Sequence, residues 1–375
     1  MGVVILCSVW VKQHRIYYLP ESGVATLVGV AVGAVMRFVY PDVDTHFFDF
    51  EPEMFYFVLL PPMIFHAGYT LRRKHFFRNV GTILMFSVLG TLVSTFVVGC
   101  FTFVLGRAGW VEIDADNPME ALLFGALISA VDPAATLSVM GAPELHCDPL
   151  LYSLVFGESV LNDAVAIVLF KSWERVYASE EQFHAATLLL ALVNFAVVSV
   201  GSVFIGVITG LNCSYLCRHS ALGQHPKYEI LLLFLFAYGS YAFAELVELS
   251  GIMALFFCGV VLAHYNSYNL SPTTRVAAHS FFASLSSMAE LCIYLYMGLS
   301  LFRLQSWNPR FIAAAIAAVL VARALNIFPF AAIANIGRTH KISIQMQVVI
   351  WFGGLRGAIA FSLAQNMPQR NHDLY

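Results

Sequence analysis

The sequence predicts an all-α polytopic membrane protein in which two of the membrane helices are interrupted. Of its 375 residues, 59% are hydrophobic and only 11% are charged, whereas soluble domains carry about 25% charged residues. Apolar windows recur along the whole chain, and at roughly 17 to 25 residues each can cross a hydrocarbon core of about 30 Å. Proline or several glycines fall inside two of these windows, where they interrupt helical hydrogen bonding.

The apolar windows predict eleven full spans. They lie near residues 22–39, 53–70, 80–105, 119–141, 149–171, 184–217, 228–247, 249–265, 279–302, 311–334 and 343–365. A twelfth stretch, residues 1–11, is too short to cross a bilayer, and we expect it to be the end of a truncated helix.

The connections between these spans alternate in charge. Basic connections carry Lys12, Arg15, Arg72, Arg73, Lys74, Arg78, Arg218, Lys227, Arg275, Arg338 and Lys341. Acidic connections carry Asp42, Asp44, Asp49, Glu51, Glu53, Glu112, Asp114, Asp116, Glu120, Glu174, Glu180, Glu181, Glu245 and Glu248. The positive-inside rule therefore predicts that the first set faces the cytosol and the second the lumen or exterior.

Few charged residues fall inside the spans, where each costs about 2.5 to 3.5 kcal/mol on insertion scales. They are Asp132, Glu158, Asp163, Glu290, Arg323 and Arg356.

The stretch GESVLNDAVAIVLF, residues 157–170, concentrates four polar side chains in one span. Glu158, Ser159, Asn162 and Asp163 lie within an arc of about 140° on an ideal helix, so we expect one polar face turned into the protein and lipid-compatible residues opposite.

Two of the buried charges offer a pairing. We interpret Glu158 as the structural partner of Arg323, since unpaired charges inside a membrane are costly. Asp163 has no matching extra base in the same patch and is interpreted as functional. For Glu290, attraction of cations and pairing with a backbone group remain equally open.

Two stretches predict interrupted helices. In ALISAVDPAATLSVMGAP, residues 126–143, Pro133 should push Asp132 out of helical geometry. In WFGGLRGAIAF, residues 351–361, Gly353, Gly354 and Gly357 permit unwound backbone around Arg356.

Broken helices in the two halves of a chain are typical of transporters with inverted repeats. Asp132 would then neutralise two positive N-terminal helix ends, and Arg356 two negative C-terminal ends. A simple proline kink with a small-residue packing seam is the alternative.

Enzyme motifs are missing from the sequence: it contains no GxxxxGK, HExxH or GxSxG. We therefore expect no enzymatic activity, no cofactor and no nucleic-acid partner, and an ion gradient as the source of energy.

The motifs FGESVLNDAVAIVL, SAVDP and GGLRGAIAF resemble, in order and spacing, those of the sodium/proton exchanger family of cation/proton antiporters. LLPPMIFHAGYTLRRKHFFRN is similar to the organellar branch of endosomes and Golgi. The resemblance implies an inverted-repeat antiporter fold with two crossing discontinuous helices, of which this chain would lack the thirteenth, last span.

The resemblance also implies a domain organisation. Residues 1–80 and 226–303 would form a dimerisation domain, residues 81–173 and 308–375 an ion-transporting core, and residues 184–217 a linker helix. A homodimer in the lipid membrane is therefore expected.

The resemblance implies that Asp163 binds the monovalent cation, with Ser159, Asn162, Asp132 and the Val131 carbonyl beside it. Supporting residues would be Glu158 and Arg323, as a pair that positions Asn162, with Pro133, Gly353, Gly354, Arg356, Gly357 and Glu290.

The implied function is electroneutral exchange of Na⁺ or K⁺ for H⁺ across an endosomal or Golgi membrane, with the plasma membrane as the alternative location. A cation channel or uniporter, and a truncated non-transporting partner of full-length exchangers, are the alternative functions.

Overall fold

The computed structural model is helical throughout the part of the chain that it describes. This part comprises residues 1–14, 19–39, 52–71, 73–110, 117–141, 147–178, 185–220, 223, 225–301, 308–338 and 340–367. Several charged residues on which the predicted orientation in the membrane depends lie outside the described residues. They are Arg15, Asp42, Asp44, Asp49, Glu51, Arg72, Glu112, Asp114, Asp116, Glu180 and Glu181.

The chain groups into two compact units. The first comprises residues 1–49, 74–192 and 294–375, and the second comprises residues 50–73 and 193–293. Two of the four boundaries fall inside long helices, α11 (Ala185–His219) and α14 (Pro272–Ser300). The division into a dimerisation domain and a core domain concerns movement and association, so it stays a prediction.

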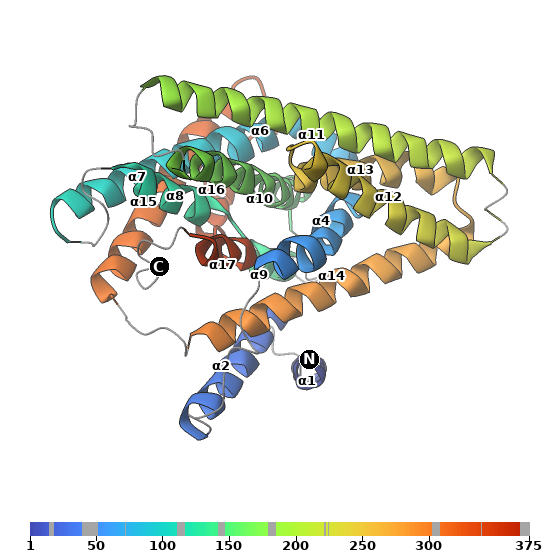
Figure 1. Ribbon diagram of the computed structural model, residues 1–375, viewed down its shortest axis with the longest axis horizontal. Helices are drawn as coiled ribbons and strands as arrows, with labels where there is room; N and C mark the ends of the chain where they lie inside the picture. The colour runs from blue at the N-terminus through green and yellow to red at the C-terminus, as the bar shows by residue number, and fades with distance from the viewer. Residues whose placement is uncertain are drawn as a thin grey trace. The chain divides into compact units, whose positions relative to one another are not determined.

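The first unit contains most of the helices (Figure 1). Besides the ends of α11 and α14, they are α1 (Gly2–Gln13), α2 (Glu21–Val39), α5 (Arg73–Arg78), α6 (Val80–Leu84), the π-helical turn η3 (Met85–Leu89), α7 (Gly90–Arg107), α8 (Met119–Ser129), α9 (Ala134–Met140), α10 (Pro149–Ala178), α15 (Pro309–Ala334), α16 (Ile344–Phe352) and α17 (Ala358–Gln365).

Helix α10 forms the centre of this unit. It packs against α6, η3, α7, α8, α9, α16 and α17. In its apolar window 89% of the residues are buried, against 22% to 39% in the other long apolar helices of the described chain. The residues opposite its polar face are apolar, as expected, and they are enclosed by protein as well, since a helix that is apolar on its remaining sides can be buried on all of them.

The second unit is arranged around α13 (Gly251–Tyr265). The other elements are α3 (Pro52–Met54), the π-helical turn η2 (Phe55–Leu59), α4 (Leu60–Tyr69), α12 (Pro226–Leu246), the 3₁₀ turn η6 (Asn266–Tyr268) and parts of α11 and α14. Helix α13 packs against α4 and α12, and the side chain of Ser250 caps it by accepting from Met253 N. At Gly68 on α4, an added Cβ would lie 2.4 Å from Phe256 O, so a glycine allows this close approach.

Each of the eleven predicted spans corresponds to one continuous helix, to two half-helices or to a series of consecutive short helical segments. Within the described residues, seven helices are long and apolar enough to cross a membrane. The windows at 119–141 and 343–365 are interrupted, as expected, and those at 53–70 and 249–265 contain shorter apolar helices. Helix α13, in the window at 249–265, is almost wholly buried by protein, so its length need not match the thickness of the bilayer.

We predict that Gly68→Leu destabilises the second unit because the new side chain meets the backbone of α13. Overpacking typically costs about 1 to 3 kcal/mol, so the melting temperature of the purified protein in detergent should fall. Gly239→Leu is the matched control, since a Cβ at this position on α12 meets nothing within 4 Å. Equal melting temperatures for the two variants would contradict the close packing of α4 on α13.

Candidate functional site

Both predicted helix breaks are present, and they touch. The helical segment α8 ends at Ser129 and α9 begins at Ala134, while α16 ends at Phe352 and α17 begins at Ala358. The Asp132 amide donates to the Leu355 carbonyl oxygen, 2.8 Å away. One break therefore satisfies a backbone group that the other leaves open, as the interior of a membrane requires.

The carboxylate of Asp132 lies at the N-terminal ends of two half-helices. In the chain, Asp132 directly precedes Pro133, the N-cap of α9. It also abuts Gly357, the N-cap of α17, where an added Cβ would lie 1.9 Å from Asp132 Oδ2. A negative charge is favourable at both ends, so the predicted position of Asp132 is confirmed.

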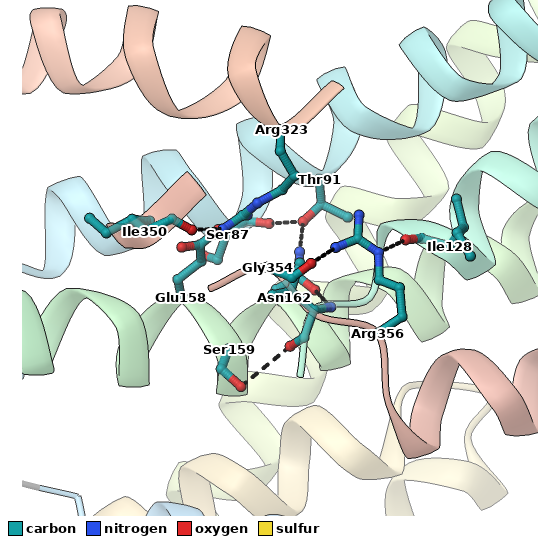
Figure 2. Close-up of polar contacts among 11 residues, drawn as sticks. Ser87, Thr91, Ile128, Glu158, Ser159, Asn162, Arg323, Ile350, Gly354 and Arg356 are labelled. Atoms are coloured by element: carbon teal, nitrogen blue, oxygen red, sulfur yellow. Dashed lines mark hydrogen bonds and ion pairs between the residues drawn. The ribbon is translucent and has the colours of Figure 1, made fainter. Parts of the chain in front are cut away.

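Two arginines lie at the opposite ends of the half-helices (Figure 2). Arg356 Nε donates to Ile128 O at 2.6 Å, in the last turn of α8, and Arg356 Nη1 donates to Gly354 O, just beyond α16. Arg323 Nη2 donates to Ile350 O at 2.7 Å, in the last turn of α16. The prediction for Arg356 is confirmed, and Arg323 takes a similar position that the sequence did not indicate.

The glycines of the second break are required by close approach. An added Cβ at Gly354 would lie 2.5 Å from Arg323 Nε, and one at Gly353 would lie 3.1 Å from Thr136 Cγ2. Gly357 likewise lies against Asp132. At each of these three positions of GGLRG a side chain would collide with a neighbouring group, which explains the glycines.

The expected pair between Glu158 and Arg323 is present. Arg323 Nη1 donates to Glu158 Oε1, and each side chain is only 3% exposed. Because Arg323 also binds Ile350 O, this ion pair connects α10, α15 and the end of α16. This geometry agrees with the interpretation of Glu158 as the structural partner of Arg323.

One turn further along α10, Asn162 binds the first break. Its Oδ1 accepts from Val131 N at 2.8 Å, and its Nδ2 donates to Thr91 Oγ1 at 2.5 Å, which in turn donates to Ser87 O. Ser159 Oγ lies 3.5 Å from Val131 O, at the limit of a hydrogen bond. Since Asn162 bonds to Val131 and Thr91, an effect of the Glu158–Arg323 pair on Asn162 stays a prediction.

Asp163 differs from the other polar residues of this face. Glu158, Ser159 and Asn162 are 2%, 8% and 1% exposed, whereas Asp163 is partly exposed. With the residues that the structure describes, Asp163 forms no hydrogen bond or ion pair, and it is close enough to Asp132 to interact electrostatically. An accessible acid beside a second acid is an arrangement suited to binding a cation.

The structure assigns Glu290 to the other unit. It lies on the part of α14 that belongs to the second unit. Its role therefore stays open, as it was from the sequence.

Two residues at the site were missed from the sequence. Thr91 holds Asn162, and Tyr294 on α14 donates its hydroxyl hydrogen to Asp132 Oδ2. Threonine and tyrosine are ordinary residues of apolar helices, so neither carried a signal comparable to a buried charge.

The whole chain matches known cation/proton exchangers. A family model described as "Sodium/hydrogen exchanger, transmembrane" matches residues 2–373. Sodium/hydrogen exchanger 8 of Homo sapiens is 38% identical over 374 residues, which cover 97% of this chain and 64% of that protein. Sodium/hydrogen exchanger 9 of Equus caballus is 36% identical over 421 residues, with coverages of 96% and 65%. The chain thus spans slightly less than two thirds of the length of these relatives.

Among solved structures, the fold is similar to that of the sodium proton antiporter MjNhaP1 from Methanocaldococcus jannaschii at pH 8. The TM-score is 0.73 with 18% sequence identity, and the match covers 97% of this chain and 83% of that one. The crossing of two interrupted helices therefore occurs in an antiporter fold.

We predict that neutralising either member of the Glu158–Arg323 pair destabilises the protein strongly. Glu158→Gln or Arg323→Gln leaves an unpaired buried charge, at a cost of about 3 to 5 kcal/mol. The double variant should lose less than the sum of the two, as measured by thermal unfolding in detergent.

The exposed pair Lys12–Glu21 is the matched control, with side chains 68% and 44% exposed. Glu21→Gln should cost less than about 1 kcal/mol. Strictly additive losses from Glu158→Gln and Arg323→Gln would show that the two charges do not stabilise each other.

Proposed function

Because the chain belongs to the sodium/hydrogen exchanger family, we propose that it exchanges Na⁺ or K⁺ for H⁺ across a membrane by alternating access. It would act as a secondary transporter and not as an enzyme. The observation that carries the proposal is Asp163, which is accessible and without a bonded partner among the described residues, next to Asp132 at the crossing.

The proposed chemistry is competition for one carboxylate. Asp163 would bind either the cation or a proton, and never both, because protonation removes the charge that attracts the cation. Oxygen ligands suit hard cations, and the candidates are Asp132, Ser159, Asn162 and the Val131 carbonyl oxygen. Loading with a cation on one side and a proton on the other then couples the two fluxes.

The formal charges at the crossing support electroneutral exchange. Asp132, Glu158 and Asp163 contribute three negative charges, and Arg323 and Arg356 contribute two positive charges. The sum is −1, so either one monovalent cation or one proton makes the site neutral. The two loaded forms carry the same charge, and the cycle moves no net charge.

Asn162 supports the same stoichiometry. Its oxygen accepts from a backbone amide and its nitrogen donates to Thr91, two bonds that require an amide, which carries both an acceptor and a donor. An ionised aspartate at this position would have no donor for Thr91 and would add a charge. The energy available is then only that of the concentration gradients, about 1.4 kcal/mol per pH unit for the proton.

The location, the use of K⁺, the homodimer and the mobile core are further parts of the proposal. The similarity of LLPPMIFHAGYTLRRKHFFRN to organellar exchangers supports an endosomal or Golgi membrane. The family fold supports a dimerisation domain of residues 1–80 and 226–303 and a moving core of residues 81–173 and 308–375, joined by the helix at 184–217. The basic connections would face the cytosol.

We predict that Asp163→Asn abolishes exchange while the protein stays folded. The amide cannot titrate and carries no charge to bind a cation, so cation-driven proton flux in proteoliposomes should fall to the level of protein-free vesicles. Glu248→Gln, which neutralises an exposed acid in the second unit, is the control and should keep the wild-type rate. Cation-dependent proton flux that persists in Asp163→Asn would refute the central role of this carboxylate.

We also predict that exchange generates no net current. In a planar bilayer, opposing cation and proton gradients should produce no steady current, because the two loaded forms have equal charge. A voltage-dependent cation current would favour a channel or uniporter. Intact dimers with neither flux nor current would favour a partner that does not transport.

A further inference from the structure

Asp132 binds a hydroxyl group that does not belong to either interrupted helix. Tyr294, on α14, donates its hydroxyl hydrogen to Asp132 Oδ2. Tyr294 as a whole is only 9% exposed, and both residues belong to the first unit. The neutral phenol thus lies against one of the two acids at the crossing without altering the formal charge there.

Two contacts converge on the same carboxylate oxygen. Oδ2 accepts from Tyr294, and it also lies so close to Gly357 that no Cβ would fit between them. Hydrogen bonds to ionised groups are roughly twice as strong as neutral ones. Held from two sides, the Asp132 carboxylate is restrained in its rotation, and Oδ1 and the remaining lone pairs of Oδ2 have defined directions.

A restrained ligand affects which ion fits. Selectivity between cations depends on the size of the site, the number of ligands and their flexibility. A carboxylate that can rotate adapts to ions of different radius, whereas one that is held favours one radius. The phenol oxygen of Tyr294 can also accept, since a hydroxyl group carries two acceptor lone pairs.

From this geometry we infer that Tyr294 is a positioning residue that sets the affinity and selectivity of the cation site by orienting Asp132. The inference rests on the proposed exchange and adds to it a residue outside the sequence motifs. Because α14 carries Tyr294, the selectivity of the site depends on an element other than the two broken helices and α10.

The test is Tyr294→Phe, which keeps the ring and removes the hydroxyl. Initial rates of proton flux are measured in proteoliposomes of the full chain against the concentrations of Na⁺, K⁺ and Li⁺. We expect the KM for the preferred cation to rise about tenfold, the effect of losing one hydrogen bond to a charged group. The KM values of the three cations should also converge, while the maximal rate changes by less than about twofold.

Tyr296→Phe removes a hydroxyl from the same helix two residues further on and should leave all three KM values unchanged. A partly unfolded variant would lower the maximal rate and leave KM as it was, so KM separates positioning from a merely structural role. The shift of the melting temperature with cation concentration provides a second measure of affinity that does not depend on transport.

Unchanged KM values and unchanged cation stabilisation in Tyr294→Phe, with an exchanging wild type, would overturn this inference alone. A wild-type protein with neither exchange nor stabilisation by any of the three cations would overturn the proposed function and this inference with it.

Discussion

The structure of the first unit depends on how two interrupted membrane helices satisfy the backbone groups that the interruptions expose. Within a bilayer no water is available for these amides and carbonyls, so protein groups have to bind them. The solution is to cross the two breaks at one place. There the Asp132 amide binds the Leu355 carbonyl, and Arg356 binds carbonyls beside both C-terminal half-helix ends.

The same solution supplies the charged groups of the proposed ion site. The acid and the arginines that complement the helix ends concentrate charge at the crossing, and α10 encloses it with a polar face of its own. On that face, Glu158 is paired with Arg323, and Asn162 is hydrogen-bonded to Val131 and Thr91. One acid of this face, Asp163, stays accessible, and the proposed binding of a cation rests on this surplus negative charge.

The constraint also explains how the fold can be shared with MjNhaP1 at 18% identity and a TM-score of 0.73. In this chain the two breaks are satisfied by a few groups: one acid, two arginines, and glycines where backbone meets side chains. Apolar residues that pack around these groups can be exchanged for others of similar volume with little cost. Most of the sequence can therefore differ while the fold is kept.

The sequence by itself determined the membrane class, the two breaks, the Glu158–Arg323 pair and the positions of Asp132 and Arg356. Each follows from a local or rare signal: apolar length, proline and glycine inside a span, and charges so few that their partners can be assigned. The tertiary structure decided that α10 is enclosed on all sides, and that Thr91 and Tyr294 reach the crossing. The enclosure of α10 depends on which helices pack around it, and this is not encoded in its own residues. The contacts of Thr91 and Tyr294 could not be predicted because hydroxyl groups cost little in an apolar helix, and only packing decides which of them meets a carboxylate or an amide.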